Sequence, residues 1–210
     1  MIRVLIVDDH PLIREGLKTL IQDEPDMRIV AEAQNGAEAL RLVEKHQLDL
    51  IILDISLPGM SGLDVLKELK QRRCKVAVLF LTVHPEKRYA IRTLKAGAAG
   101  YLTKESAPVE LVRAIRKIAS GGRYVSESLA ETLAIDLEVK TTGLLHESLS
   151  NREYQVFCMI ADGREVREVA QQLCLSEATI YTYRERILEK MKTKSVAELT
   201  RYALENGLLD

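Results

Sequence analysis

The stretch VLIVDDHPLIREGL, residues 4–17, opens with a short apolar run that passes directly into Asp8 and Asp9. Three later apolar runs also lead into a polar residue: 50–53 into Asp54, 78–81 into Thr82, and 101–102 toward Lys104. If these runs are parallel strands, their carboxyl ends meet at one edge of a sheet, which is where open α/β sheets bind their ligands. The sequence therefore predicts an α/β fold in which three carboxylates, a hydroxyl and an ammonium converge.

Length and composition indicate a globular chain of two small domains. The chain has 210 residues, of which 47% are hydrophobic and 29% are charged, and a typical domain holds about 100–150 residues. No apolar stretch approaches the roughly 20 residues that cross a bilayer. The N-terminus also lacks the basic and apolar segments of a signal peptide. We therefore expect a cytoplasmic protein that does not enter a membrane.

Charge and cysteine content argue against two further classes of protein. The net charge of -1 argues against a surface that is a polyanion receptor throughout, so any nucleic-acid surface must be local. Cys74, Cys158 and Cys174 are far apart and form no C-x-x-C pair, which predicts neither a disulfide framework nor a zinc site. We expect three reduced, buried thiols.

Residues 1–120 alternate short β-branched runs with amphipathic segments, the pattern of repeated βα units. The first run is apolar almost throughout, as a strand buried on both faces of a parallel sheet should be. The expected strands span residues 2–7, 28–33, 49–54, 76–82 and 100–103. This pattern predicts a doubly wound (βα)5 domain over residues 1–120.

The polar residues at the strand ends suit one kind of chemistry. Asp8 and Asp9 can hold a divalent cation, and Mg2+ prefers oxygen ligands. Such an ion removes the repulsion between a carboxylate nucleophile and a phosphoryl group, so Asp54 is the candidate phosphoacceptor. Lys104 supplies a positive charge to the phosphoryl oxygens, and the Thr82 hydroxyl can donate a hydrogen bond to one of them.

The alternation stops after residue 119, and the sequence then changes character. We expect a linker with one short helix over residues 121–147 and an all-helical domain over residues 148–210. Within that domain, residues 150–153 and residues 195–198 each have the pattern of a helix capping box, in which a serine and a glutamate satisfy each other's backbone amides.

Residues 165–191 contain two helical patterns separated by a short turn at residues 174–176, as in a helix-turn-helix. In the second pattern, four apolar residues form one stripe: Ile180, Ile187, Leu188 and Met191. The opposite face carries Tyr181, Thr182 and Glu185. An outward tyrosine and threonine suit a DNA groove, although mixed-charge helix faces are often simply solvated.

Residues 1–120 also resemble the receiver domain of two-component response regulators. Four motifs carry the resemblance: VLIVDDHPLIREGL at 4–17, DLIILDISLPGMSGLDVL at 49–66, LFLTVH at 79–84 and AGAAGYLTKE at 96–105. The resemblance implies a flavodoxin-like, CheY-like fold and phosphorylation of Asp54 by a sensor histidine kinase. It further implies that Asp9, Asp54 and the Ser56 main-chain carbonyl bind Mg2+ (or Mn2+) directly, while Asp8 acts mainly through water.

The same resemblance implies roles for the residues around the phosphoacceptor. Thr82 becomes the switch hydroxyl, Lys104 the phosphate-binding amine, and Tyr101 a rotating aromatic residue that is coupled to Thr82. Ser56 and His84 each lie two residues beyond a site residue, at positions that border the attacking water and tune the lifetime of the phosphoryl group.

Residues 149–206 resemble the LuxR/NarL class of helix-turn-helix domains, a four-helix all-α fold. The matching stretches are LSNREYQVFCMIADG at 149–163, EVAQQLCLSEATIYTYRERILEKM at 168–191 and KSVAELTRYALENGLL at 194–209. The resemblance implies base-reading positions at Tyr181, Thr182 and Glu185, and DNA-backbone contacts at Thr179, Arg186 and Lys192.

This chain departs from that pattern at three positions. Tyr181 stands where a lysine or small polar residue is frequent, Glu185 stands where a basic residue is common, and Glu165 replaces the usual serine cap. The operator sequence therefore does not carry over from relatives. The last helix, through Val196, Leu199 and Ala203, resembles the dimer contact of the family, with plain core packing as an equal alternative.

These observations predict a DNA-binding transcriptional response regulator of the NarL/FixJ type. It is not a conventional enzyme, because it promotes phosphoryl transfer only onto its own Asp54 and the hydrolysis that follows. The expected partners are a sensor histidine kinase, double-stranded DNA and a second copy of the chain, at least when phosphorylated, with RNA polymerase as a further candidate. Two alternatives stay open: a haloacid-dehalogenase phosphatase, which wants an aspartate where Ser56 stands, and a DNA-binding protein whose receiver ignores phosphate.

Overall fold

The computed structural model describes residues 1–127, 129–131 and 144–209. The chain divides into two compact units, residues 1–131 and residues 132–210. The expected linker over residues 121–147 lies partly outside the described residues, so its boundaries and its short helix stay a prediction.

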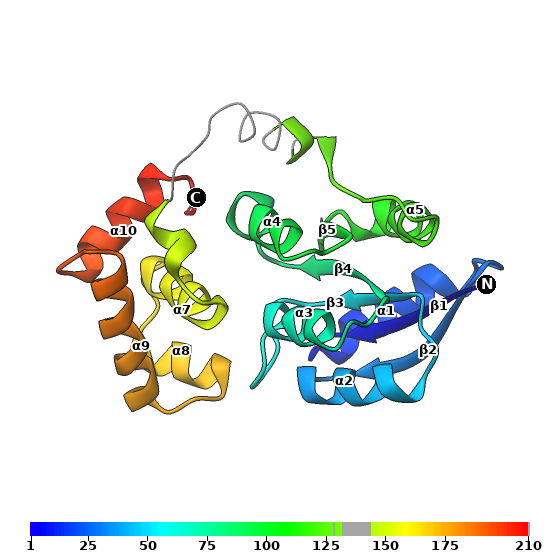
Figure 1. The fold of residues 1–210 in the computed structure, drawn as a ribbon, viewed down its shortest axis with the longest axis horizontal. Helices are drawn as coiled ribbons and strands as arrows, with labels where there is room; N and C mark the ends of the chain where they lie inside the picture. The colour runs from blue at the N-terminus through cyan, green and yellow to red at the C-terminus, as the bar shows by residue number, and fades with distance from the viewer. Residues whose placement is uncertain (128, 132–143, 210) are drawn as a thin grey trace. The chain divides into compact units, whose positions relative to one another are not determined.

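The first unit is built on five parallel strands in the order β2-β1-β3-β4-β5 (Figure 1). Their bounds are β1 Ile2–Val7, β2 Met27–Ala33, β3 Leu50–Leu53, β4 Ala77–Thr82 and β5 Gly100–Thr103. The order doubles back at β1, as in doubly wound folds, so the predicted (βα)5 architecture is confirmed. Each expected strand is present within two residues of its predicted ends.

Helices follow each strand: α1 Pro11–Gln22, α2 Gly36–Lys45, α3 Gly62–Gln71, α4 Glu86–Lys95 and α5 Ala107–Ala119. One core cluster joins α1 and α5 to alternate residues of the strands, among them Ile6, Ile52 and Leu81. The residues between them, such as Leu5 and Leu53, are also fully buried. The central strands are therefore covered on both faces, which explains why they are apolar without alternation.

The second unit consists of helices. A short 3-10 helix η1, Leu145–Ser148, precedes α7 Asn151–Ala161, α8 Val166–Leu173, α9 Glu177–Lys190 and α10 Val196–Glu205. No strand occurs among residues 144–209, which confirms the predicted all-helical domain. The predicted apolar stripe of α9 is buried at Ile180, Ile187 and Met191, while Leu188 is only partly buried.

The caps of these helices agree only partly with the sequence patterns. Around Ser150 the predicted capping box is complete, because the Glu153 carboxylate accepts from Ser150 N at 2.7 Å and the Ser150 hydroxyl accepts from Glu153 N at 3.3 Å. The second box is only half formed. There the Ser195 hydroxyl caps the helix, but the Glu198 carboxylate accepts from Lys194 N instead.

The expectation of three buried thiols is wrong, and for the last helix the alternative of core packing is favoured. Cys174 is exposed and Cys74 only partly buried, so only Cys158 is the buried thiol expected for all three. Cys174 is the C-cap residue of α8 and lies in the turn before α9. Leu199 and Ala203 are completely buried in the domain itself, where α10 packs on α7, so these two residues are core residues.

Glu153 links α7 to α9 by an ion pair with Lys190 that is buried only at its Glu153 end, and its charge should stabilise the second unit. Its carboxylate lies 2.6 Å from Lys190 Nζ. Burial alone would raise the pKa of Glu153, but the hydrogen bonds from Lys190 and Ser150 outweigh burial and hold the pKa below 4.5. A lowered carboxyl pKa adds stability above the unfolded value, and this stability is lost as the pH falls through the folded value.

We therefore expect Glu153→Gln to lower the free energy of unfolding by about 1 kcal/mol at pH 7, since the Lys190 end of the pair is partly screened by solvent. The difference from wild type should shrink as the pH falls below about 4.5. Urea denaturation at a series of pH values measures both. Glu189→Gln, an exposed residue of α9 next to Lys190, is the matched control. A Glu153→Gln defect that persists unchanged at low pH would contradict the charge argument.

Candidate functional site

Three carboxylates and one ammonium meet at the carboxyl edge of the sheet, as predicted. Lys104 Nζ lies 2.6 Å from an oxygen of Asp8 and 2.7 Å from an oxygen of Asp54. Asp8 and Asp54 are almost fully buried, whereas the Asp9 side chain is 34% exposed. The site therefore has a buried floor and one carboxylate at its mouth.

Backbone hydrogen bonds between neighbouring strands fix these positions. Asp54 N donates to Val7 O at 2.9 Å, and Lys104 N donates to Thr82 O at 2.8 Å. The loop after Asp54 turns back so closely that a Cβ on Gly62 would lie 2.1 Å from the Asp54 carbonyl oxygen. Only glycine fits at position 62, and its lack of a side chain lets the loop lie against the backbone of Asp54.

The ammonium stays charged in this environment. Burial would lower the pKa of Lys104, but the negative charge of Asp54 and the hydrogen bonds to Asp54 and Asp8 outweigh it and raise the pKa above 10.5. The Lys104 ammonium lies between the buried carboxylates of Asp8 and Asp54 and offsets their mutual repulsion, which solvent cannot screen there.

The arrangement suits a divalent cation bound mainly by oxygen. Ligand atoms of Asp8, Asp9, His10 and Asp54 all lie within 4.8 Å of one another. Asp9 Oδ1 is buried and makes no hydrogen bond within the described part of the chain. A buried, unsatisfied carboxylate oxygen is costly unless a cation approaches it, so the donor set fits the predicted ion. His10 is a member that the sequence analysis did not single out.

The predicted switch residues lie next to the site but do not contact each other through their hydroxyl groups. Thr82 is fully buried, and its hydroxyl has no hydrogen-bond partner among the described residues. The Tyr101 ring is also buried, and its hydroxyl donates to the His84 carbonyl oxygen at 2.9 Å. Burial, ahead of the charges of Glu86 and Asp54, raises the pKa of Tyr101 well above 10.0. Tyr101 is therefore a neutral donor directed at the loop after β4.

Ser56 and His84 are brought together by the loops after β3 and β4. The Ser56 hydroxyl and His84 Nε2 lie 2.8 Å apart, a hydrogen-bond distance. The His84 ring also packs against Tyr89, with ring centroids 4.7 Å apart. Because Ser56 N approaches an Asp54 carboxylate oxygen at 3.3 Å, this pair borders the phosphoacceptor.

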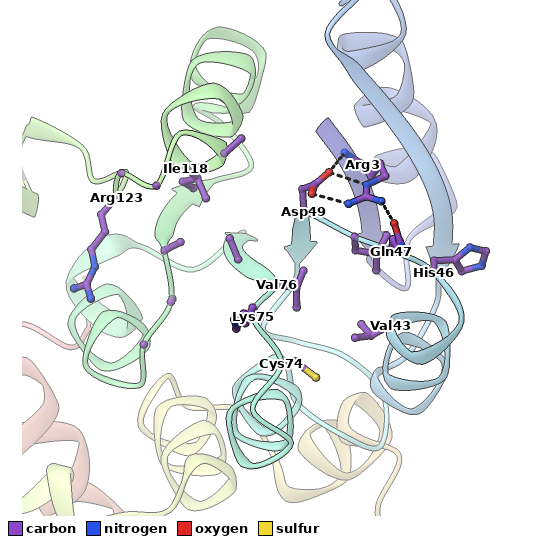
Figure 2. A pocket seen from close by; sticks show the side chains of 18 residues that line it. Arg3, Val43, His46, Gln47, Asp49, Cys74, Lys75, Val76, Ile118 and Arg123 are labelled. Atoms are coloured by element: carbon purple, nitrogen blue, oxygen red, sulfur yellow. Dashed lines mark hydrogen bonds and ion pairs between the residues drawn. The ribbon is translucent and has the colours of Figure 1, made fainter. Parts of the chain in front are cut away.

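An open cavity of about 750 Å3 lies at the opposite edge of the same sheet (Figure 2). Its one lining carboxylate, Asp49, is held by Arg3, whose side-chain hydrogen bond lowers the pKa of Asp49 to about 2. The carboxylate cluster is absent from the residues that line this cavity, so size alone does not make it the functional site.

The predicted base-reading residues of α9 lie on its outer face. Tyr181, Thr182 and Glu185 are exposed, and so are Arg186 and Lys192. Thr179 is partly buried, and its hydroxyl pairs with that of Ser176 at the start of the helix. The outer face of α9 is thus accessible to a ligand. Thr179, which is predicted to contact the DNA backbone, also takes part in capping the helix.

A groove of about 430 Å3 beside α9 adds two cations that were not predicted, Arg164 and Arg167. Its lining includes Tyr181 together with Arg164, Arg167 and Arg184. The Arg184 guanidinium lies 5.6 Å from the centre of the Tyr181 ring, within cation–π range. Arg164 and Arg167 lie on either side of Glu165, at the start of α8, and they line the same groove as Tyr181 of α9. This pair of arginines is the sequence signal that was missed.

None of the described helices is both long and apolar enough to span a membrane. The family comparisons are more informative. A model of the response regulator receiver domain matches residues 4–116, and a model of the luxR family of bacterial regulatory proteins matches residues 147–203.

One curated relative and two solved structures agree with these matches. Response regulator UvrY of Escherichia coli (strain K12) is 38% identical over 209 residues, which cover 99% of this chain and 96% of that protein. A LuxR-family two-component response regulator structure from Aurantimonas sp. SI85-9A1 is 38% identical, covers 64% of this chain and 96% of its own, and has a TM-score of 0.60. RcsB from Salmonella enterica serovar Typhimurium, solved bound to a promoter in the presence of a phosphomimetic, shares the fold at 22% identity, with a TM-score of 0.66 over 96% of this chain and 98% of its own.

Proposed function

The chain belongs to the two-component response regulators of the NarL/FixJ type and is a DNA-binding regulator, and from this premise we propose that phosphorylation of Asp54 controls its binding to promoters. The observation that carries the proposal is the buried constellation of Asp8, Asp54 and Lys104 at the sheet edge. The phosphoryl donor is a sensor histidine kinase.

The transfer exchanges one bond to phosphorus for another. A carboxylate oxygen of Asp54 attacks phosphorus while the bond to the imidazole nitrogen of the kinase breaks, and that nitrogen keeps the electron pair. Asp8, Asp9, Asp54 and the Ser56 carbonyl would hold Mg2+ (or Mn2+), which when bound neutralises charge on the phosphoryl oxygens. Lys104 balances the added negative charge by leaving its two carboxylate partners for the phosphoryl oxygens.

Two pairs of residues would respond to phosphorylation: Thr82 and Tyr101 would transmit it, and Ser56 and His84 would set the lifetime of the phosphoryl group. The Thr82 hydroxyl, which has no hydrogen-bond partner among the described residues, donates to a phosphoryl oxygen once Asp54 is modified, and the segment between Thr82 and Tyr101, which contains α4, moves with it. Ser56 and His84, already hydrogen-bonded beside Asp54, limit the approach of the water that hydrolyses the acyl phosphate. The domain thus acts on its own carboxylate and turns over no separate substrate, which is why we do not class it as a conventional enzyme.

The second unit would read DNA through α9. Tyr181, Thr182 and Glu185 face the major groove, while Thr179, Arg186 and Lys192 contact the backbone. Residues 149–210 hold nine basic and ten acidic side chains, so the attraction of one copy for phosphate is modest. A homodimer doubles the contacts, and we propose that phosphorylation favours it in the cytoplasm, with RNA polymerase as the further partner.

Genome-wide footprinting of wild type against Asp54→Ala tests the proposed control. We expect wild-type footprints at a limited set of promoters, with occupancy roughly tenfold lower in the variant, because allosteric coupling of this kind is typically 1–3 kcal/mol. Western blotting for equal protein levels is the control. Identical footprints for both proteins would favour a DNA-binding protein whose receiver does not respond to phosphate.

A further inference from the structure

We infer that His10 is a nitrogen ligand of the acidic site, which makes it a site for the first-row transition ions Co2+, Ni2+ and Zn2+ as well as for Mg2+. The inference rests on the proposed cation role of Asp8, Asp9 and Asp54. It adds a residue that neither the family motif nor the sequence analysis assigns to the cation.

The distances around His10 match those of ligands on one ion. His10 Nδ1 lies 2.8 Å from Asp9 Oδ1 and 3.1 Å from Asp8 Oδ1. Around an ion with ligands at about 2.1 Å, two adjacent corners of an octahedron are about 3 Å apart. The imidazole nitrogen therefore already has the spacing of an adjacent ligand from each of the two carboxylate oxygens.

The approach of His10 to Asp9 is not a hydrogen bond. Asp9 Oδ1 is buried and has no hydrogen-bond partner among the described residues, although Nδ1 is only 2.8 Å away. The nitrogen and the oxygen are thus at ion-pair distance without hydrogen-bond geometry, an arrangement that two ligands of one cation also have. The contact of Nδ1 with Asp8 does have hydrogen-bond geometry, and an ion would replace that proton.

Local hydrogen bonding fixes the backbone of His10. His10 is the N-cap residue of α1, and its backbone N–H donates to Asp8 Oδ1 at 2.9 Å. Pro11 follows at the first helical position, where its fixed φ sets the direction of the helix. The His10 side chain is 65% exposed, so an ion from solvent can reach Nδ1 without any rearrangement of the core.

The chemistry of the imidazole ligand determines which ions bind more tightly. Imidazole binds Co2+, Ni2+ and Zn2+ well and Mg2+ poorly, whereas carboxylates suit Mg2+. A nitrogen ligand should therefore strengthen binding of the transition ions and leave Mg2+ nearly unaffected.

Calorimetric titration of the full chain with NiCl2, CoCl2 and MgCl2 tests the inference on His10→Gln. We expect roughly tenfold weaker Ni2+ and Co2+ binding and a Mg2+ affinity within about twofold of wild type. Electron spin-echo spectroscopy of bound Mn2+ should show a 14N coupling in wild type that His10→Gln loses. His46→Gln is the matched control, because His46 is exposed and lines the cavity at the opposite edge of the sheet.

The outcomes separate this inference from the proposed function. Equal Ni2+ affinity in wild type and His10→Gln, or a 14N coupling that survives in the variant, overturns the role of His10 while Mg2+ binding stands. A loss of Ni2+ binding in His46→Gln as large as that in His10→Gln also overturns it. Absence of Mg2+ binding to wild type would instead refute the proposed cation role itself.

Discussion

Asp54→Ala should abolish labelling of the chain by acetyl phosphate in the presence of Mg2+, with a rate at least about a thousandfold below wild type. The carboxylate is the proposed nucleophile, and alanine offers no oxygen in its place. Asp8 and Asp54 both contact Lys104, but Asp54 alone lies at the end of β3 with Ser56 N directed at its carboxylate. Intact-protein mass spectrometry measures the added phosphoryl group directly.

Two controls make the labelling result specific. Asp23→Ala removes an exposed carboxylate at the end of α1 and should label at the wild-type rate. Far-ultraviolet circular dichroism of Asp54→Ala should match wild type, because loss of one buried charge from a repulsive cluster does not unfold the sheet. Labelling of Asp54→Ala at the normal rate would refute the assignment of the phosphoacceptor.

Lys104→Met should lower the stability of the first unit by about 3 kcal/mol without Mg2+, because breaking a buried ion pair leaves uncompensated charge. The Lys104 side chain is 10% exposed, and Asp8 and Asp54 are 3% and 2% exposed, so solvent cannot replace the ammonium. Saturating Mg2+ should recover more stability in this variant than in wild type, since the ion then faces carboxylates without a competing cation.

Urea denaturation with and without Mg2+, followed by circular dichroism, measures both effects. Lys75→Met is the control, because Lys75 is exposed and makes no ion pair with any described residue. A Lys104→Met variant as stable as wild type in the absence of Mg2+ would mean that the two buried carboxylates do not repel each other as the geometry requires.

The strand pattern made most of the first unit predictable. Apolar runs buried on both faces leave little choice but a parallel sheet, and parallel strands bring Asp8, Asp54 and Lys104 to one edge whatever the loops do. The Ser150 capping box was equally readable, because its partners are three residues apart and need no tertiary contact.

Features that depend on side-chain direction were not predictable. The sequence does not say that the His10 ring points to Asp9 or that the Tyr101 hydroxyl reaches the His84 carbonyl, since both require loop geometry. Arg164 and Arg167 join the groove beside α9 only through the packing of one helix on another. The linker carries too weak a pattern to fix its ends, and the roles of the DNA-contact residues stay predictions.

The central claim, that the state of Asp54 sets the affinity for DNA, is tested most directly by one binding measurement. Fluorescence anisotropy would compare the full chain with and without acetyl phosphate and Mg2+, at fixed salt, on a duplex taken from a wild-type footprint. We predict that phosphorylation tightens wild-type binding by about ten- to a hundredfold and leaves Asp54→Ala unchanged. Equal wild-type affinity in both conditions, or the same gain in Asp54→Ala, would contradict the claim.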